Sequence, residues 1–292
     1  MNTKNVMDLI DPSEQKKIFA RRDAIRAGVT AGLAMGSLPM VLAAMAKTAG
    51  AQGTTPSVND VLNFALTLEY LEAEFYNIAT GAAGQAFPAT YAGPNAVFTG
   101  AGAGTQAVFN EIAKHENAHV ALLRAALGGA AVAKPRFDFT GGKGATTNGK
   151  FNGPFADVYT NPGTFLALAQ AFEDTGVRAY KGGAQFLISN VPVLETALQI
   201  HSIEARHASK VRRIRGEKGW ITGRTNTLPM QAQGVYGPGS PASTYPAEDN
   251  VTQATINVST LAGTAGVNAA TEAFDEPLDV ATVNAIAGLF IY

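Results

Sequence analysis

Two short motifs in the chain pair a glutamate with a histidine three residues later. They are Glu116–Asn117–Ala118–His119 and Glu204–Ala205–Arg206–His207. Residues three apart on a helix lie on one face, about 5–6 Å from each other, so each motif can direct a carboxylate and an imidazole at a single point. Oxygen and nitrogen ligands of this kind suit iron or manganese, and the ligand type alone does not separate these metals. The motifs therefore predict a metal site.

Two further glutamates complete the set of expected ligands. Glu69 and Glu173 lie in other segments with a helical pattern, and each is followed seven positions later by a tyrosine, Tyr76 or Tyr180. Four carboxylates and two imidazoles from four helices match the ligand set of a two-metal site in a helical bundle. We therefore expect the cofactor to be two iron or manganese ions.

The expected ligands interrupt apolar stripes of helical spacing, which places them in the core. A buried charge is costly unless it is paired or binds a metal. The stripes therefore predict either a metal centre or a metal-free network of buried Glu–His hydrogen bonds. The stripe of the last long helix reads Val193, Ala197, Ile200, Glu204, His207, Val211 and Ile214.

Three more ionisable residues lie near the expected ligands. Glu72 and His201 are each one helical turn from a ligand on the same face, where they would either support the ligands or form a buried hydrogen-bonded pair. His115 directly precedes Glu116 and so points about 100° away from it. We expect a surface or structural role for His115.

Capping residues and glycines mark the ends of four long helices. Ser57 with Asp60 resembles a capping box, and Asn161 followed by Pro162 is a typical helix start. The expected helices span residues 57–80, 105–127, 161–190 and 192–216. A long connection separates the second and third helices, which a bundle explains if these two helices run parallel and the chain crosses its full length. The connection contains four phenylalanines that can pin it to the helices: Phe137, Phe139, Phe151 and Phe155.

The first 51 residues are typical of an export signal. Arg21–Arg22 resembles a twin-arginine motif, an apolar run spans Ala27–Ala46, and Ala49–Gly50–Ala51 fits a cleavage site before Gln52. We expect the mature protein to be exported to the periplasm or cell envelope. The alternative is a retained membrane anchor, because about 20 helical residues can cross a bilayer.

Residues 217–292 form a Gly/Pro-rich extension that we expect to pack on the bundle. Its last part predicts a short helix capped by Asp279, with an apolar stripe that includes Val283 and Phe290. Thr255–Leu261 predicts a short extended segment. Four basic residues end the preceding long helix, and we attribute them to its dipole and to solvent and not to phosphate or membrane binding: Lys210, Arg212, Arg213 and Arg215.

The composition excludes several classes of function. The 292 residues carry a net charge of −1, which gives no electrostatic attraction to nucleic acid. There is no cysteine, so disulfides and cysteine-ligated zinc or iron–sulfur sites are ruled out. The partners that remain are metal ions and a small molecule, with a homo-oligomer left open and a membrane only if the signal is retained.

These motifs resemble those of exported bacterial ferritin-like proteins, often labelled desiccation-related. The resemblance covers about residues 57–292, and besides the ligands it rests on Phe274–Asp275–Glu276–Pro277–Leu278. It implies an all-α, ferritin-like four-helix bundle over residues 52–216, with the export signal at 1–51 and the extension at 217–292. It further implies that Glu116 and Glu204 bridge the metals, and that Tyr76 and Tyr180 bond ligand glutamates across the bundle. The implied ligands are Glu69, Glu116, His119, Glu173, Glu204 and His207.

Three functions fit this ligand set. The first is a redox enzyme in which two metals react with peroxide or dioxygen, as ferroxidases, peroxidases and manganese catalases do. The second is a metal-storing cage, which the export signal, the long crossover and the extension disfavour. The third is a non-catalytic stress or envelope protein that uses the fold as a rigid module.

Overall fold

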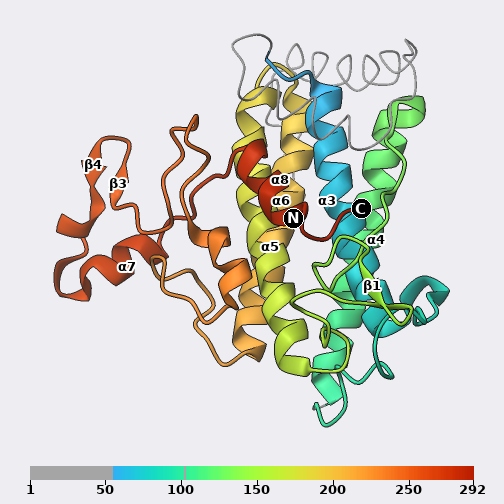
Figure 1. Ribbon diagram of the computed structural model, residues 1–292. Helices are drawn as coiled ribbons and strands as arrows, with labels where there is room; N and C mark the ends of the chain where they lie inside the picture. The colour runs from blue at the N-terminus through green and yellow to red at the C-terminus, as the bar shows by residue number, and fades with distance from the viewer. Residues whose placement is uncertain (1–54, 102) are drawn as a thin grey trace, which may run out of the picture.

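Four long helices form the body of the computed structural model, which describes residues 55–101 and 103–292 (Figure 1). α3 packs along α4, and α5 packs along α6. The predicted all-α bundle is therefore confirmed. The predicted export signal at residues 1–51 lies outside the described residues. The helix bounds are Val58–Thr80 for α3, Ala103–Leu127 for α4, Pro162–Ala184 for α5 and Val191–Ile214 for α6.

Local sequence signals set most of the helix ends. Ser57 and Asp60 form a reciprocal capping box at the start of α3, and Gly81 ends that helix in the left-handed conformation, with φ of 71°. Asn161 caps α5 and Asn190 caps α6 through their side chains. The predicted end of the third helix near residue 190 was wrong, because α5 ends at Ala184 and a 3-10 turn follows over Gln185–Leu187.

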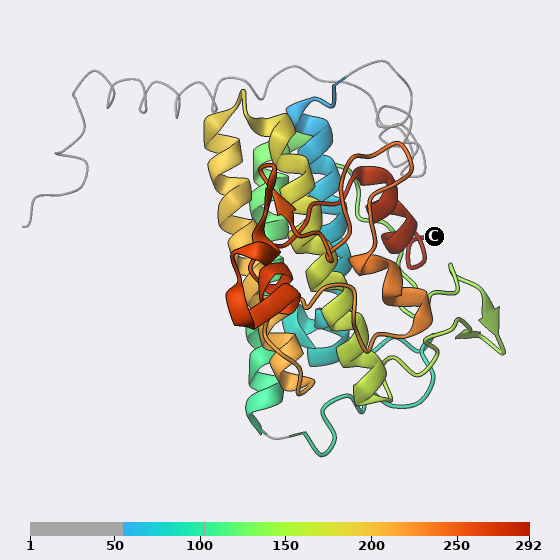
Figure 2. The ribbon, with the colours of Figure 1, turned by 90° about the vertical axis from the view of Figure 1, so that its left-hand side faces the viewer.

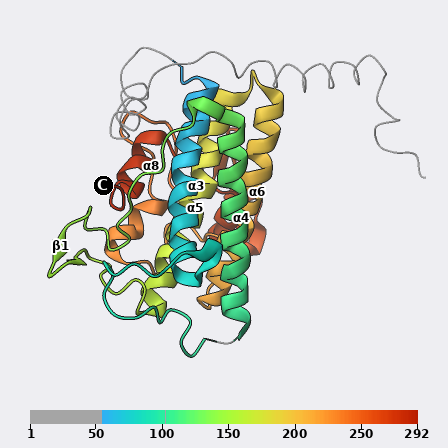
Figure 3. The same cartoon turned by 90° about the vertical axis from the view of Figure 1, so that its right-hand side faces the viewer.

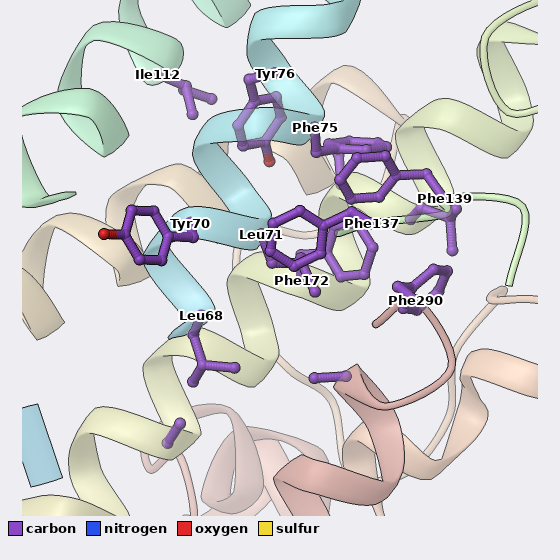
Figure 4. Close-up of a cluster of buried hydrophobic side chains, with 14 of the residues drawn as sticks. Leu68, Tyr70, Leu71, Phe75, Tyr76, Ile112, Phe137, Phe139, Phe172 and Phe290 are labelled. Carbon is purple, nitrogen blue, oxygen red and sulfur yellow. The ribbon is translucent and has the colours of Figure 1, made fainter. Parts of the chain in front are cut away.

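The crossover between α4 and α5 runs the length of the bundle, because these two helices point the same way (Figures 1 and 3). It carries a small antiparallel hairpin of β1 (Thr146–Thr147) and β2 (Lys150–Phe151). Its four phenylalanines are all buried, as predicted, in the main hydrophobic core with residues of α3, α5 and the C-terminal end of the chain. Figure 4 shows two of them, Phe137 and Phe139, beside Phe75, Phe172 and Phe290. Within that core Phe139 lies 5.2 Å from Phe75, and Phe290 lies 4.9 Å from Phe172, between ring centroids.

The C-terminal extension covers one side of the bundle and contacts α5 (Figure 2). Asp279 caps α8 (Val280–Ala287) through two backbone N–H groups, and Val283 and Phe290 are buried. The segment predicted to be extended over Thr255–Leu261 instead contributes β4 (Ile256–Asn257), paired with β3 (Thr252–Gln253), and then a 3-10 turn. Further helical elements in this part were not predicted: the 3-10 helix Met230–Tyr236, the 3-10 turn Gly263–Ala265 and α7 (Gly266–Glu272).

None of the helices among residues 55–101 and 103–292 is long and apolar enough to cross a membrane.

Candidate metal centre

The six residues expected to be metal ligands come together in the middle of the bundle. They form two groups of four, and within each group one ligand atom from every residue lies within 4.8 Å of the others. Glu116 of α4 and Glu204 of α6 belong to both groups, so their carboxylates are placed to join two ions. The first group is Glu69, Glu116, His119 and Glu204, and the second is Glu116, Glu173, Glu204 and His207.

In the first group the imidazole of His119 points at three carboxylates. Its Nδ1 atom lies 3.1 Å from an oxygen of Glu69, 3.1 Å from one of Glu116 and 3.2 Å from one of Glu204. All three glutamates are 0% exposed. The nitrogen lone pair and the three oxygens therefore converge on one dry point, as a metal ligand set does.

The second group has the same design around His207. The Nδ1 atom of His207 lies 2.8 Å from Glu116 and 3.3 Å from Glu173. Within the described chain several of these buried atoms make no hydrogen bond of normal geometry, although the histidine nitrogens and the carboxylate oxygens lie together as ion pairs: Oε1 of Glu116, Oε2 of Glu173, both oxygens of Glu204 and Nδ1 of His207. Buried polar atoms are normally satisfied, and divalent iron or manganese would satisfy these donors. The residues present thus fit a pair of metal ions.

Two tyrosines tie the halves of the bundle together at the centre. The Tyr76 hydroxyl of α3 donates to Glu173 of α5 at 2.5 Å, and the Tyr180 hydroxyl of α5 donates to Glu69 of α3. Each hydroxyl binds the second oxygen of a carboxylate whose first oxygen faces a histidine. The tyrosines therefore orient Glu69 and Glu173 toward the centre.

Burial and the close packing of like charges raise the pKa values of several groups in the centre, so these groups keep their protons to higher pH. Burial, opposed by the His119 hydrogen bond, raises the pKa of Glu69 to about 7, and burial with repulsion from Glu69 raises the pKa of Glu204 to about 8. Burial alone would lower the pKa of both histidines, but the surrounding carboxylates raise the pKa of His119 to about 12 and of His207 to about 11. A metal ion entering the centre would displace such protons.

Glu72 adds a fifth carboxylate beside the centre. It is 3% exposed, and burial together with repulsion from Glu204 and Glu173 raises its pKa well above the ordinary value. The space it occupies depends on Gly176 of α5. A Cβ atom at position 176 would lie 3.2 Å from an oxygen of Glu72 and 3.4 Å from one of Glu204, so the glycine leaves room for both carboxylates. Glycine at this position was not singled out from the sequence.

The structure does not bring His201 into the centre. It belongs to neither ligand group, and the charges that act on it are those of Lys181 and Asp275. Its Nε2 atom is buried without a hydrogen-bond partner in the described chain. The structure therefore gives His201, one turn before Glu204 on α6, no contact with the two ligand groups, and its supporting role stays a prediction.

His115 contacts the centre in a way that its position next to Glu116 did not predict. Its Nδ1 atom lies 2.9 Å from Nε2 of His207, and the two rings lie edge to edge, with centroids 5.2 Å apart and an angle of only 10° between their planes. Its side chain is 42% exposed and its Nε2 lies 3.6 Å from Glu111. The expected surface location is thus correct, but a contact with a ligand histidine was missed. The i, i+4 spacing of His115 and His119 was the available signal.

A second buried polar cluster joins the bundle to the extension. Arg178 of α5 pairs with Glu248, with 2.8 Å between Nε and Oε1 and both side chains 0% exposed. Its guanidinium also donates to the backbone carbonyls of Glu276 and Gly237. Arg212, which was attributed to solvent and the helix dipole, is instead buried in an ion pair with Asp174.

Comparison with known proteins agrees with this geometry. The family model of the ferritin-like domain matches residues 57–217, which contain all four long helices and every residue of the two ligand groups. The search of curated proteins found no match. The chain therefore belongs to the ferritin-like family.

Proposed function

We propose that the protein is an oxidoreductase that holds two iron or manganese ions and reacts with hydrogen peroxide or dioxygen. The observation that carries this proposal is the set of four buried glutamates and two histidines whose ligand atoms face one another in two overlapping groups. Four carboxylates share only two imidazoles, so the two histidines alone cannot pair with every carboxylate oxygen in the groups, and several of these buried atoms make no hydrogen bond of normal geometry.

The residues divide into clear roles in this proposal. Glu69 and His119 would hold one ion, Glu173 and His207 the other, and Glu116 and Glu204 would bridge them. Bound iron or manganese would supply the electrons for the reaction with the oxidant, because both metals change oxidation state. The protein's own contribution is to fix the ligands, through Tyr76 and Tyr180, and to hold all four ligand glutamates away from solvent.

The size of the spaces near the centre supports a small oxidant. A cavity of about 20 Å³, room for one water-sized molecule, lies between α3, α5 and the start of α6. Its walls are apolar side chains and the ring of Tyr180, whose hydroxyl bonds the ligand Glu69. A molecule as small as dioxygen fits such a space, whereas the burial of the ligands leaves no room for a large organic substrate.

The direct test is to load the protein anaerobically with iron or manganese, remove free metal, and add peroxide or dioxygen in separate experiments. We expect peroxide loss or oxygen uptake, with a change in the absorption of the metal. The matched control is Glu204→Ala with His207→Ala, which should lose the metal and the reaction while keeping its helical circular dichroism. If two ions bind and neither oxidant is consumed faster than by free metal, the enzyme proposal fails and the non-catalytic stress-protein alternative stands.

We also propose that the protein works outside the cytoplasm, in the periplasm or cell envelope. The basic residues, the apolar run and Ala49–Gly50–Ala51 support this. N-terminal sequencing of the native protein should find a start at or near Gln52 in a periplasmic or envelope fraction. An intact Met1 on membrane-bound material would favour the anchor.

A further inference from the structure

We infer that His115 is a positioning residue for His207, and that it makes the metal site of the second ligand group bind metal more tightly than the site of the first. The inference rests on the proposed two-metal centre but goes beyond it, because it makes the two sites unequal. It follows from the contact between Nδ1 of His115 and Nε2 of His207, at 2.9 Å.

The contact determines which nitrogen of His207 is free to bind metal. Nδ1 of His207 faces the carboxylates of Glu116 and Glu173, so it must offer its lone pair to an ion. The ring hydrogen then resides on Nε2, which donates it to Nδ1 of His115. A histidine ligand that donates its other N–H in this way is held in the right tautomer and orientation, and loss of such a partner typically costs about 10–100-fold in metal affinity. The two ring planes differ by only 10°, so the Nε2–H bond of His207 points along the plane of the His115 ring, toward the lone pair of Nδ1.

The first ligand group has no equivalent support. Among residues 55–101 and 103–292, the hydrogen bonds of His119 are made through Nδ1 alone. His115 directly precedes Glu116 on α4, and the matching position on α6, directly before Glu204, is Ile203. An isoleucine side chain has no acceptor for the Nε2–H of His119. The two sites therefore share their ligand types but differ in one contact, and the chain itself offers the variant that would remove the difference.

The test isolates each site and measures metal binding without turnover. Glu69→Gln leaves the second group intact and Glu173→Gln leaves the first, because each of these glutamates belongs to one group only. Metal-free protein of each background is titrated anaerobically with Co²⁺ by calorimetry and by the visible absorption of the bound ion. We expect the second site alone to bind Co²⁺ about 10-fold or more tightly than the first.

Substitution of His115 should act on one site only. In the Glu69→Gln background, His115→Phe, which keeps a planar aromatic ring and lacks an acceptor, should weaken Co²⁺ binding by about 10–100-fold and shift its absorption. His115→Gln, whose amide oxygen can accept from His207, should restore part of the affinity. In the Glu173→Gln background His115→Phe should change the affinity by less than about threefold. His201→Phe, which alters a histidine outside both groups, should leave both sites unchanged.

Weaker binding by the His115 variants could also come from a folding defect. A variant that should bind metal more tightly separates the two explanations. Ile203→His in the Glu173→Gln background should tighten Co²⁺ binding at the first site, because it gives His119 the acceptor it lacks. Equal affinities for the wild-type sites, or His115→Phe that binds Co²⁺ as tightly as its parent, would overturn the inference while leaving the two-metal proposal intact. A wild-type protein that binds no Co²⁺, iron or manganese would overturn the two-metal proposal itself.

Discussion

The two halves of the bundle, α3–α4 and α5–α6, carry the same residues where they face the centre and different residues elsewhere. Glu69 and Tyr76 match Glu173 and Tyr180, and each Glu-x-x-His motif has its counterpart in the other half. An arginine five positions after each ligand histidine also bonds a residue of the partner helix in its own half, Arg124 to Tyr70 and Arg212 to Asp174. The agreement ends beside the centre, where Glu72 and His115 of the first half correspond to Gly176 and Ile203 of the second.

The comparison of the two halves indicates which sequence positions the candidate metal centre constrains. Ligands and the tyrosines that orient them must be duplicated, because two ions need two equal sets of donors. Outside that set each half has adapted to what covers it. At matching positions of α3 and α5, five residues after the ligand glutamate, Glu74 pairs with Lys134 of the crossover and Arg178 pairs with Glu248 of the extension. One pair is largely open to solvent and the other is fully buried.

Replacing a glutamate that belongs to both ligand groups should reduce metal binding more than replacing a glutamate that belongs to one. Glu204→Ala removes a residue of both groups and should reduce the metal content from about two ions to none, whereas Glu173→Ala should leave about one ion, since Glu173 serves one group only. Elemental analysis of protein loaded anaerobically with manganese and then desalted measures both. Two ions retained by Glu204→Ala would show that the groups are not metal sites.

The outer pairs should differ strongly in their contribution to stability. Arg178→Ala leaves Glu248 buried and uncompensated and should lower the free energy of unfolding by about 3–5 kcal/mol. Glu74→Gln breaks an exposed pair and should cost no more than about 1 kcal/mol. Urea unfolding followed by circular dichroism measures the two variants side by side. Similar losses would mean that the extension is attached no more firmly than the crossover.

The ionisable groups of both halves should make the melting temperature of the metal-free protein fall as the pH rises. In the folded protein the pKa values of four groups lie above their ordinary values, which are 6.5 for histidine and 4.5 for glutamate. The groups are His119, His207, Glu69 and Glu204. A raised folded pKa contributes stability that is complete below the ordinary value and is lost as pH rises through the folded value. The melting temperature of the metal-free protein should therefore fall between pH 5 and pH 9, and bound metal should oppose the fall.

The same melting experiment can compare the two halves if it is repeated with the variants His119→Phe and His207→Phe. Each substitution removes one group with a raised pKa and should flatten the decline of the metal-free melting temperature by a similar amount. A metal-free melting temperature that rises between pH 5 and pH 9 would contradict the assignment of these protons to the centre.

The two tyrosines should give moderate effects of similar size in the two halves. Tyr76→Phe and Tyr180→Phe each delete one hydroxyl that bonds a buried ligand carboxylate and should each lower stability by about 1–3 kcal/mol. Thermal unfolding of the metal-free proteins measures the loss, with Tyr70→Phe as a control outside the centre. A large difference between Tyr76→Phe and Tyr180→Phe would show that one half orients its glutamate by other means.

Contacts between distant residues account for most of what the sequence analysis missed. The Asp174–Arg212 pair joins residues 38 positions apart, and only its burial shows that Arg212 is not a solvated helix end. Gly176 is unremarkable until the structure places two carboxylates against it. His201 lies one helical turn from Glu204, yet it belongs to neither ligand group. Such features depend on how helices pack, which helical spacing in one segment does not specify.

The sequence by itself determined the local and periodic properties of this protein. Caps at Ser57, Asn161 and Asp279 and stripes of spacing three and four depend on residues within a turn or two of each other, so they can be read without a fold. The tertiary structure alone decided that Glu72 fits against Gly176 and that His115 reaches His207, whereas the bonds of Tyr76 and Tyr180 to glutamates of the opposite half were already implied by the resemblance. The physical reason is that these contacts depend on the rotation and the offset of one helix against another. Both are fixed only when the apolar stripes of all four helices pack together in one core.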